Sequence, residues 1–204
     1  MSGVVSLASH KHRKAAARGF TEWRRIFRSI TDLDEHTRWA DLPDEIILFL
    51  CEGSPESKHA FYDLLMRSHR LGNGHDLEVQ PFDRLSILLN AYFFITDQAR
   101  FECMRRLGWI ETIPRESKPI IEVVMESGTY DYPTLLEAPA STQVHPAYEE
   151  DRRSRGIDRS ALVRKHTPQA LRQFKQALQE KESDIPSKPR EWKIKLPSNV
   201  LSPL

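Results

Sequence analysis

The chain has 204 residues, which fits one domain with additional tails, and its apolar fraction of 39% is low enough that part of it is expected not to pack. Thirty basic side chains balance twenty-nine acidic ones, and this excludes a global field that steers the whole protein toward nucleic acid or an anionic membrane. No stretch approaches the roughly 18 consecutive apolar residues of a membrane span, and the N-terminus lacks the apolar region of a secretory signal.

The first 21 residues contain no acidic side chain but several Ser, Ala, Lys and Arg residues. We interpret residues 1–19 as a flexible basic arm. The same composition is typical of a transit peptide, which stays open as an alternative to a cytoplasmic location. Cys51 and Cys103 lie in apolar helical patterns, where a reduced thiol behaves as a small hydrophobe, and this favours the cytoplasm.

An amphipathic helix is predicted from residue 20 onward. Apolar residues recur there at spacings of three and four, and arginines occupy the other faces. In one interpretation the apolar side packs on the core, and the arginines interact electrostatically with acidic residues downstream. In the other, this helix binds a partner, because Trp and Arg are enriched at interface hot spots. The apolar set is Phe20, Trp23, Phe27 and Ile30, and the basic set is Arg24, Arg25 and Arg28.

The charge changes sign within this part of the chain. Residues 10–30 carry seven basic side chains against one acidic side chain, whereas residues 32–56 carry eight acidic against one basic. A short basic arm offers electrostatic affinity for phosphate groups without an element that reads bases. We therefore expect weak, salt-sensitive nucleic-acid binding at most.

Proline and glycine mark three helices in the middle of the chain, because proline suits the first turn and glycine the C-terminal exit. The first is expected between Pro43 and Gly53, and the second, with Ser54 as N-cap, extends to Gly72. The third covers residues 81–108 and is the longest. Its first half is apolar nearly all round, so we expect other helices to surround it as the central helix of a bundle.

Asp83, Asn90 and Asp97 are spaced by seven residues in the third helix and so form one line along it. We expect a buried polar line that meets an adjacent helix, with Asp97 paired to an arginine. The alternative is a ligand or catalytic pocket, in which Asp97 acts together with two loop histidines. The arginines in question are Arg67, Arg70 and Arg100, and the histidines are His69 and His75.

Other chemical motifs are incomplete. Glu56 and His59 have the spacing of a metal-ligating Glu-x-x-His pair, but a di-iron site needs a second such pair, which the chain lacks. Asp76 stands beside His75 and is a candidate to orient its imidazole, although the Asn-Gly sequence there is mainly turn chemistry. No dinucleotide, phosphate-loop or zinc signature occurs. We therefore predict no metal, no cofactor and no catalytic residue.

The C-terminal third is expected to be less compact. Two short helices are assigned between residues 120 and 138, and a linker over residues 139–157. Residues 158–182 form an amphipathic helix with one narrow apolar stripe, and residues 183–204 form an extended, Pro-containing tail. Trp192 and Ile194 alternate there with lysines.

These patterns predict an all-α fold: a compact helical bundle around a long central helix within residues 20–138, an amphipathic C-terminal helix and extended tails. The leading functional hypothesis is a non-enzymatic adaptor or accessory subunit that binds a larger protein assembly through its N-terminal helix and C-terminal segment. A basic-arm nucleic-acid-binding protein and a small-ligand-binding or enzymatic bundle are the alternatives, and homo-oligomer formation stays open. The expected partner-binding residues are Phe20, Trp23, Arg24, Arg25, Phe27, Arg28, Trp192 and Ile194.

Overall fold

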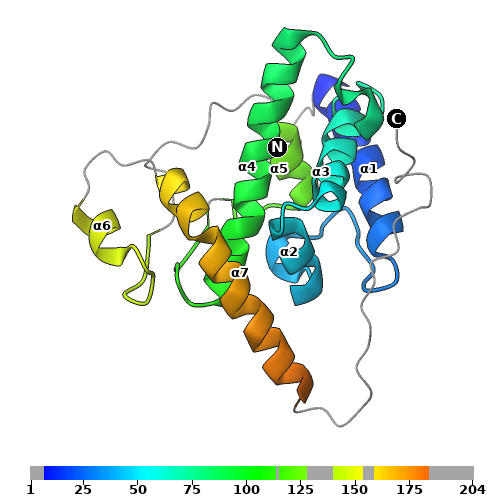
Figure 1. The fold of residues 1–204 in the computed structure, drawn as a ribbon. Coiled ribbons are helices and arrows are strands. Elements are labelled where there is room, and N and C mark those ends of the chain that lie inside the picture. Colours follow the sequence, from blue (N-terminus) through cyan, green and yellow to red (C-terminus); the bar gives the residue numbers. More distant parts are fainter. Residues whose placement is uncertain (1–6, 114, 128–139, 154–158, 184–204) are drawn as a thin grey trace, which may run out of the picture.

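The computed structural model describes residues 7–113, 115–127, 140–153 and 159–183. Within these ranges the fold is all-α, as the sequence predicts, and its one strand-like contact is an isolated bridge between Ile110 and Ser141. No helix in these ranges is both long enough and apolar enough to cross a membrane. Figure 1 labels the α-helices. The elements are α1 (Leu7–Phe27), η1 (Trp39–Asp41), α2 (Asp44–Cys51), α3 (Pro55–Ser68), η2 (Gly74–Leu77), α4 (Phe82–Arg106), α5 (Ile120–Ser127), α6 (Tyr148–Arg153) and α7 (Arg159–Ser183).

The middle helices begin and end close to the residues that the sequence indicates. Ser54 caps α3, because its side-chain oxygen accepts a hydrogen bond from the backbone N–H of Ser57 at 3.1 Å. Pro43 and Pro81 precede α2 and α4. Gly108 follows α4 with a φ of 71°, a left-handed conformation that favours glycine.

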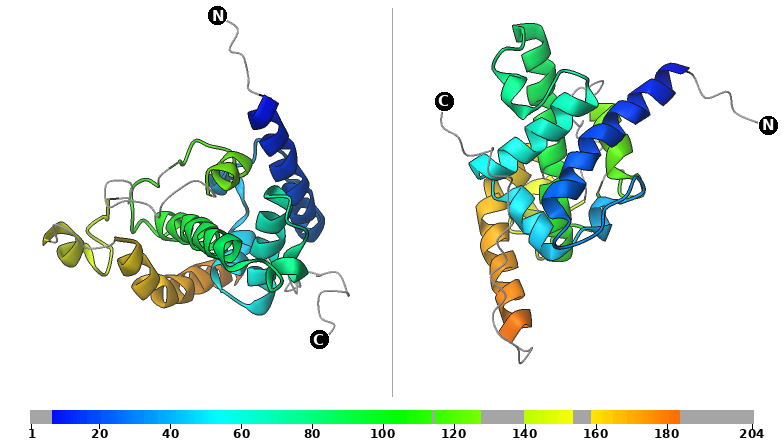
Figure 2. Two further views of the ribbon diagram at one scale, coloured as in Figure 1. Left: turned by 90° about the horizontal axis from the view of Figure 1, so that it is seen from above. Right: turned by 90° about the vertical axis from the view of Figure 1, so that its right-hand side faces the viewer.

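The helix α4 lies against four other helices. It contacts α2, α3, α5 and α7, while α1 packs on α3 and α5. The two views of Figure 2 place α1 and α7 on different sides of α4. The buried side chains of α1, α3, α4 and α5 belong to one hydrophobic core.

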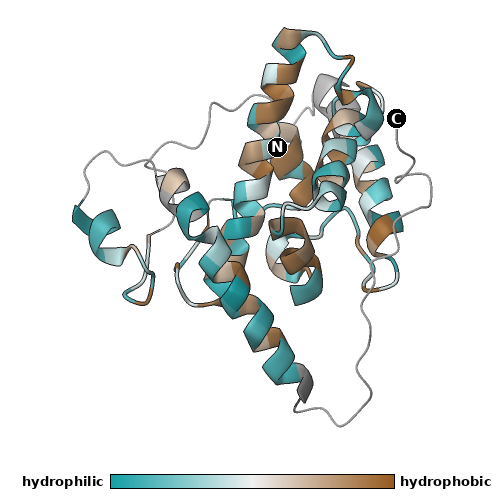
Figure 3. Cartoon of the chain, viewed as in Figure 1, coloured by the Kyte–Doolittle hydropathy of each residue, from teal (hydrophilic) through white to brown (hydrophobic). Residues whose placement is uncertain are grey.

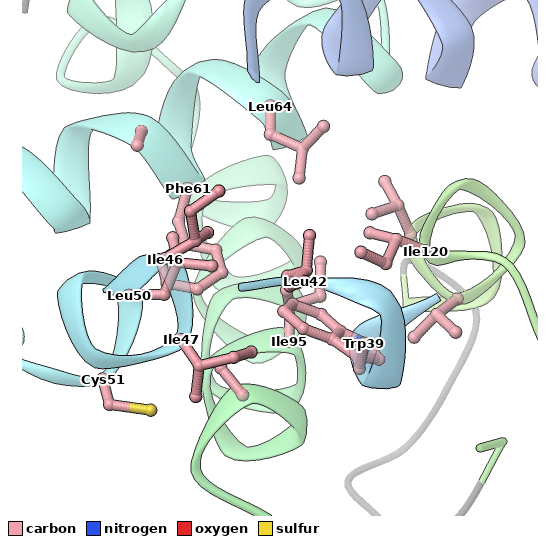
Figure 4. Close-up of a cluster of buried hydrophobic side chains, with 14 of the residues drawn as sticks. Trp39, Leu42, Ile46, Ile47, Leu50, Cys51, Phe61, Leu64, Ile95 and Ile120 are labelled. Carbon is pink, nitrogen blue, oxygen red and sulfur yellow. The ribbon is translucent and has the colours of Figure 1, made fainter. Parts of the chain in front are cut away.

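Trp23 of α1 stands in an aromatic cluster at the centre of the core. Its indole Nε1 donates to the backbone carbonyl of Ala60 at 2.8 Å. Its ring meets the rings of Trp39 and Phe61 edge-on, with centroids 6.1 and 5.5 Å away. Figure 4 shows the side chains that gather beside this cluster from η1, α2, α3, α4 and α5; they include Trp39, Ile46, Ile47, Leu50, Phe61, Ile95 and Ile120.

The aromatic residues of α1 are core residues, contrary to the prediction that they contact a partner. Phe20, Trp23 and Phe27 are each at most 1% exposed. Burial of one large apolar side chain stabilises a fold by about 1.5–3 kcal/mol, and α3 and α5 offer the matching apolar surfaces. Packing therefore uses the aromatic side of α1 and leaves only its basic side at the surface.

Two segments differ from the predicted boundaries. The expected flexible arm of residues 1–19 is helical from Leu7, and Ala16 extends the buried side of α1 by one turn. The expected linker over residues 139–157 contains α6, and backbone hydrogen bonds tie its start to Trp109 and Glu111. These bonds pair backbone N–H and C=O groups, and such pairing cannot be inferred from the composition of the segment. The second short helix before residue 138 and the tail with Trp192 and Ile194 fall outside the described residues.

A buried carboxylate joins three elements at the C-terminal end of α4. Glu102 is 0% exposed, and the guanidiniums of Arg105 and Arg106 bind it at 2.7–2.8 Å. Arg106 also binds the Asp44 carboxylate at 2.6 Å and donates to backbone carbonyls around η1, with the shortest of these bonds, 2.7 Å, at Leu42. Arg106 thus links α4 to the start of α2 and to η1.

Replacing Arg106 should destabilise the fold more than replacing Arg105. Arg106→Met leaves buried Glu102 with a single guanidinium and removes the links to α2 and η1, so we expect a loss of about 3–5 kcal/mol in the free energy of unfolding. Arg105→Met keeps Glu102 bound to Arg106 and should cost about 1 kcal/mol. Urea denaturation followed by circular dichroism measures both, and equal losses would contradict the linking role of Arg106.

Removing the central indole should also be costly. Trp23→Ala opens a cavity and leaves the Ala60 carbonyl without its donor, so we expect the free energy of unfolding to fall by about 3–5 kcal/mol. The matched variant Arg24→Ala, on the exposed side of the same helix, should change it by less than about 0.5 kcal/mol. Thermal unfolding of the two variants checks this, and a Trp23→Ala protein as stable as the parent would be inconsistent with the described core.

Candidate interaction surfaces

Asp97 is buried against arginines, as one of the two interpretations expects. Its carboxylate accepts a hydrogen bond from Arg100 at 3.0 Å and two from Arg164 of α7 at 3.3 Å. Burial raises the pKa of Asp97, and the guanidiniums of Arg164 and Arg100 oppose that shift. The partner from a second helix is thus on α7, and neither Arg67 nor Arg70 fills this role.

The expected buried polar line is buried only at Asp97. Asp83 and Asn90 are both exposed. Helix α7 reaches α4 at Arg164, level with Asp97 and Phe93, and leaves the more N-terminal turns of this face open. The prediction that other helices surround the first half of α4 is therefore wrong.

The structure does not bring the proposed catalytic groups together. His69 lines a cavity of about 120 Å³ with Ser68, Arg70, Val124 and Met125, which includes neither Asp97 nor His75. His75 instead lies beside His59, with ring centroids 4.7 Å apart. Within the described ranges there is no group of three or more His, Cys, Asp or Glu residues that could hold a metal ion.

Asp63 holds the loop that carries His75. Its carboxylate accepts hydrogen bonds from the backbone N–H of Gly74 at 3.0 Å and from Arg67 at 2.7 Å. Asp76 bonds back to the N–H of Asn73 at 2.8 Å, which closes the turn η2. The polar groups around this loop thus stabilise a turn, and Asp76 does not orient an imidazole.

A second pair of histidines, which the sequence analysis missed, joins the segment before α6 to α7. His145 packs against Trp109 and His166, with ring centroids 5.5 and 5.6 Å away. Its Nδ1 accepts a hydrogen bond from the backbone N–H of Ala147 at 3.0 Å. No local sequence spacing indicates this pair, because His145 and His166 are twenty-one residues apart and come into contact only in the folded chain.

Large apolar side chains are exposed along the N-terminal half of α4. Phe82 is 85% exposed, Ile87 49% and Phe93 42%, and Val79 just before the helix is 76% exposed. Figure 3 shows apolar residues along this part of α4, where it rises above the other helices. Phe82 and Phe93 fall on one side of α4 at 100° per residue, whereas Ile87 falls on another. Exposed apolar surface of the kind that Phe82 and Phe93 form marks interaction sites in soluble proteins.

A second candidate surface is the basic side of α1. At 100° per residue its exposed cations fall within about 120° of one another around the helix axis, so they share one side of the helix. Arg25 pairs with Glu22 at 2.8 Å, whereas the other four have no ion pair within the part of the chain that the structure describes. The set is Lys14, Arg18, Arg24, Arg25 and Arg28.

Comparison with known proteins adds no assignment to either surface. No family model matches the chain, and neither a curated protein nor a solved structure matches it.

Acidification should destabilise the fold through His145, which is buried, and His59, which is half-buried. Burial and the neighbouring His166 lower the pKa of His145 against the opposing effect of Asp151, and burial and His75 lower that of His59. Below the unfolded value of about 6.5 the unfolded chain therefore binds protons that the folded protein does not, and stability falls as the pH drops. Urea denaturation at pH 7.5, 6.5 and 5.5 measures this slope.

The double variant His59→Gln/His145→Gln tests the assignment of that slope. It should reduce the loss of stability between pH 7.5 and 5.5, whereas the exposed control His36→Gln should leave the loss unchanged. An unchanged slope in the double variant would assign the pH dependence to other groups.

Proposed function

We propose that this protein is a non-enzymatic adaptor that binds an acidic segment of another protein through the basic side of α1. The observation that carries the proposal is the row of exposed cations on a helix whose opposite side is fixed in the core. From Lys14 to Arg28 this row extends over fourteen residues, or about 21 Å of helix. That length matches a partner helix of about four turns.

The rigid attachment of α1 favours binding. Phe20, Trp23 and Phe27 fix the helix against α3 and α5, so the backbone that carries the cations is already in place before a partner arrives. Pre-organisation reduces the entropy lost on association. Arg24 and Arg25 also lie in the last turn of α1, where positive charge complements the helix dipole and leaves the guanidiniums exposed.

An acidic protein segment fits this surface better than a nucleic acid does. Asp32, Asp34 and Glu35 are exposed directly after α1, so negative side chains lie at the C-terminal end of the basic row. A continuous polyanion that followed the row would meet these carboxylates, whereas a short acidic helix ends before them. Nucleic-acid binding therefore remains the alternative outcome of the test below.

Binding through Trp192 and Ile194 of the C-terminal segment stays a prediction. Trp192 and Ile194 lie outside the described residues, so the adaptor proposal rests on α1 alone.

Reversing charges on α1 should weaken association with the native partner. The experiment purifies the tagged protein from its own cells, with and without nuclease, and identifies by mass spectrometry what stays bound. For Arg24→Glu/Arg28→Glu we expect at least about tenfold weaker association, equivalent to 1.4 kcal/mol, and a weaker dependence on salt. The control Arg153→Glu/Arg172→Glu changes the net charge equally at exposed sites of α6 and α7 and should bind as the parent does.

Three outcomes are distinguishable. A protein partner that survives nuclease and is lost only in the α1 variant supports the proposal. An association that nuclease removes favours the nucleic-acid alternative. A partner retained equally by both double variants places the interface away from α1.

A further inference from the structure

The open face of α4 continues the face that α7 covers further along the helix. At 100° per residue, Phe82, Ser86 and Phe93 lie within about 40° of one another around the axis, and Asp97 lies on the same side. Arg164 of α7 binds Asp97 and lies 5.6 Å from the ring centroid of Phe93. The uncovered surface therefore begins beyond the contact with Arg164 and extends to the N-terminal end of α4.

Trp192 and Ile194, the residues of the C-terminal segment expected to bind a partner, are too close to Ser183 to reach this end of α4. Helix α7 follows α4 from Asp97 toward Asp44, where Lys181 binds at 3.1 Å, so Ser183 lies about 28 Å beyond Arg164 along the axis, and Phe82 lies about 16 Å on the other side. Trp192 is nine residues after Ser183 and reaches at most about 31 Å. The distance to Phe82 is roughly 44 Å at this rise per residue.

We propose that a second copy of this chain packs on this surface, with the two α4 helices antiparallel about a twofold axis. In this arrangement Phe82 of one copy lies opposite Phe93 of the other, and Ser86 and Asn90 lie near the axis. A twofold interface uses the same patch on both subunits, so both apolar ends are covered at once.

The charges at the two ends of the patch favour the antiparallel arrangement. Glu78 and Asp83 are exposed beside Phe82, whereas Arg100 and Arg164, whose side chains are 19% and 36% exposed, lie beside Phe93. Antiparallel packing places the acidic end of each copy against the basic end of the other. Parallel packing would place like charges together, which is destabilising.

The available area is compatible with a small but specific dimer. Phe82 and Phe93 together expose about 250 Å² in each copy, because a phenylalanine side chain offers about 200 Å². Val79 and the flanking charged side chains add to this on both copies. A stable interface needs roughly 1,200 Å² in total, so the pairing falls at the lower end of that class and should have a micromolar dissociation constant.

This inference goes beyond the adaptor proposal and uses a different helix. Sedimentation equilibrium of the full chain, from about 1 to 200 µM with reductant, should show a concentration-dependent shift from the 23.7 kDa chain to twice that mass. Phe82→Asp should weaken dimerisation at least tenfold. Val144→Asp, at an exposed apolar residue outside the patch that is 65% exposed, should leave it unchanged.

A charge variant tests the arrangement without altering the apolar residues. Asp83→Arg places a third cation beside Arg100 and Arg164 of the other copy and should weaken the dimer, whereas Glu111→Arg, at an exposed acidic residue elsewhere, should not. Circular dichroism confirms that each variant is folded. A chain that stays monomeric throughout, or a dimer unaffected by both Phe82→Asp and Asp83→Arg, overturns the inference, and neither result bears on binding through α1.

Discussion

The fold depends on the burial of Glu102, a charge that the interior tolerates only with its partners in place. Desolvation of a carboxylate costs several kcal/mol, and Arg105 and Arg106 offset this cost by hydrogen bonds of 2.7–2.8 Å. Because Arg106 also binds Asp44 and the carbonyls around η1, the position of α2 is fixed relative to α4. Lys181 binds the same Asp44 at 3.1 Å, so the end of α7 also belongs to this network of charges. Four elements thus share one network of charges.

A second constraint is that the apolar side of α1 can either pack in the core or contact a partner, but not both. The interior between α3 and α5 requires large side chains, and Trp23 both fills it and satisfies the Ala60 carbonyl. Once the aromatic side is buried, the cations of α1 can only face solvent, where they cost nothing in desolvation and are available to a partner. The proposed binding function therefore follows from how the core is filled.

The length and position of α7 decide what remains open on α4. Where Arg164 meets Asp97, α7 covers the face, and from the partly exposed Phe93 to Phe82 the same face is open. If two chains associate there, each dimer would present two copies of the basic side of α1. Linked sites of this kind raise the avidity for a partner with repeated acidic segments without any new contact.

The sequence by itself determined the class of the fold and the extent of its middle helices, because proline, serine and glycine act locally through φ angles and caps, as at Ser54 and Gly108. It also predicted, as one of two interpretations, that Asp97 pairs with an arginine. Only the tertiary structure decided that Arg164 joins Arg100 at Asp97, that Phe20, Trp23 and Phe27 belong to the core, and that Asp83 and Asn90 are exposed. Helical periodicity defines the apolar side of a helix but not what packs on it, since an apolar side chain is equally compatible with a core and with an interface. Which of the two it joins depends on residues far away in the chain, such as Arg164 and Ala60, that folding brings alongside.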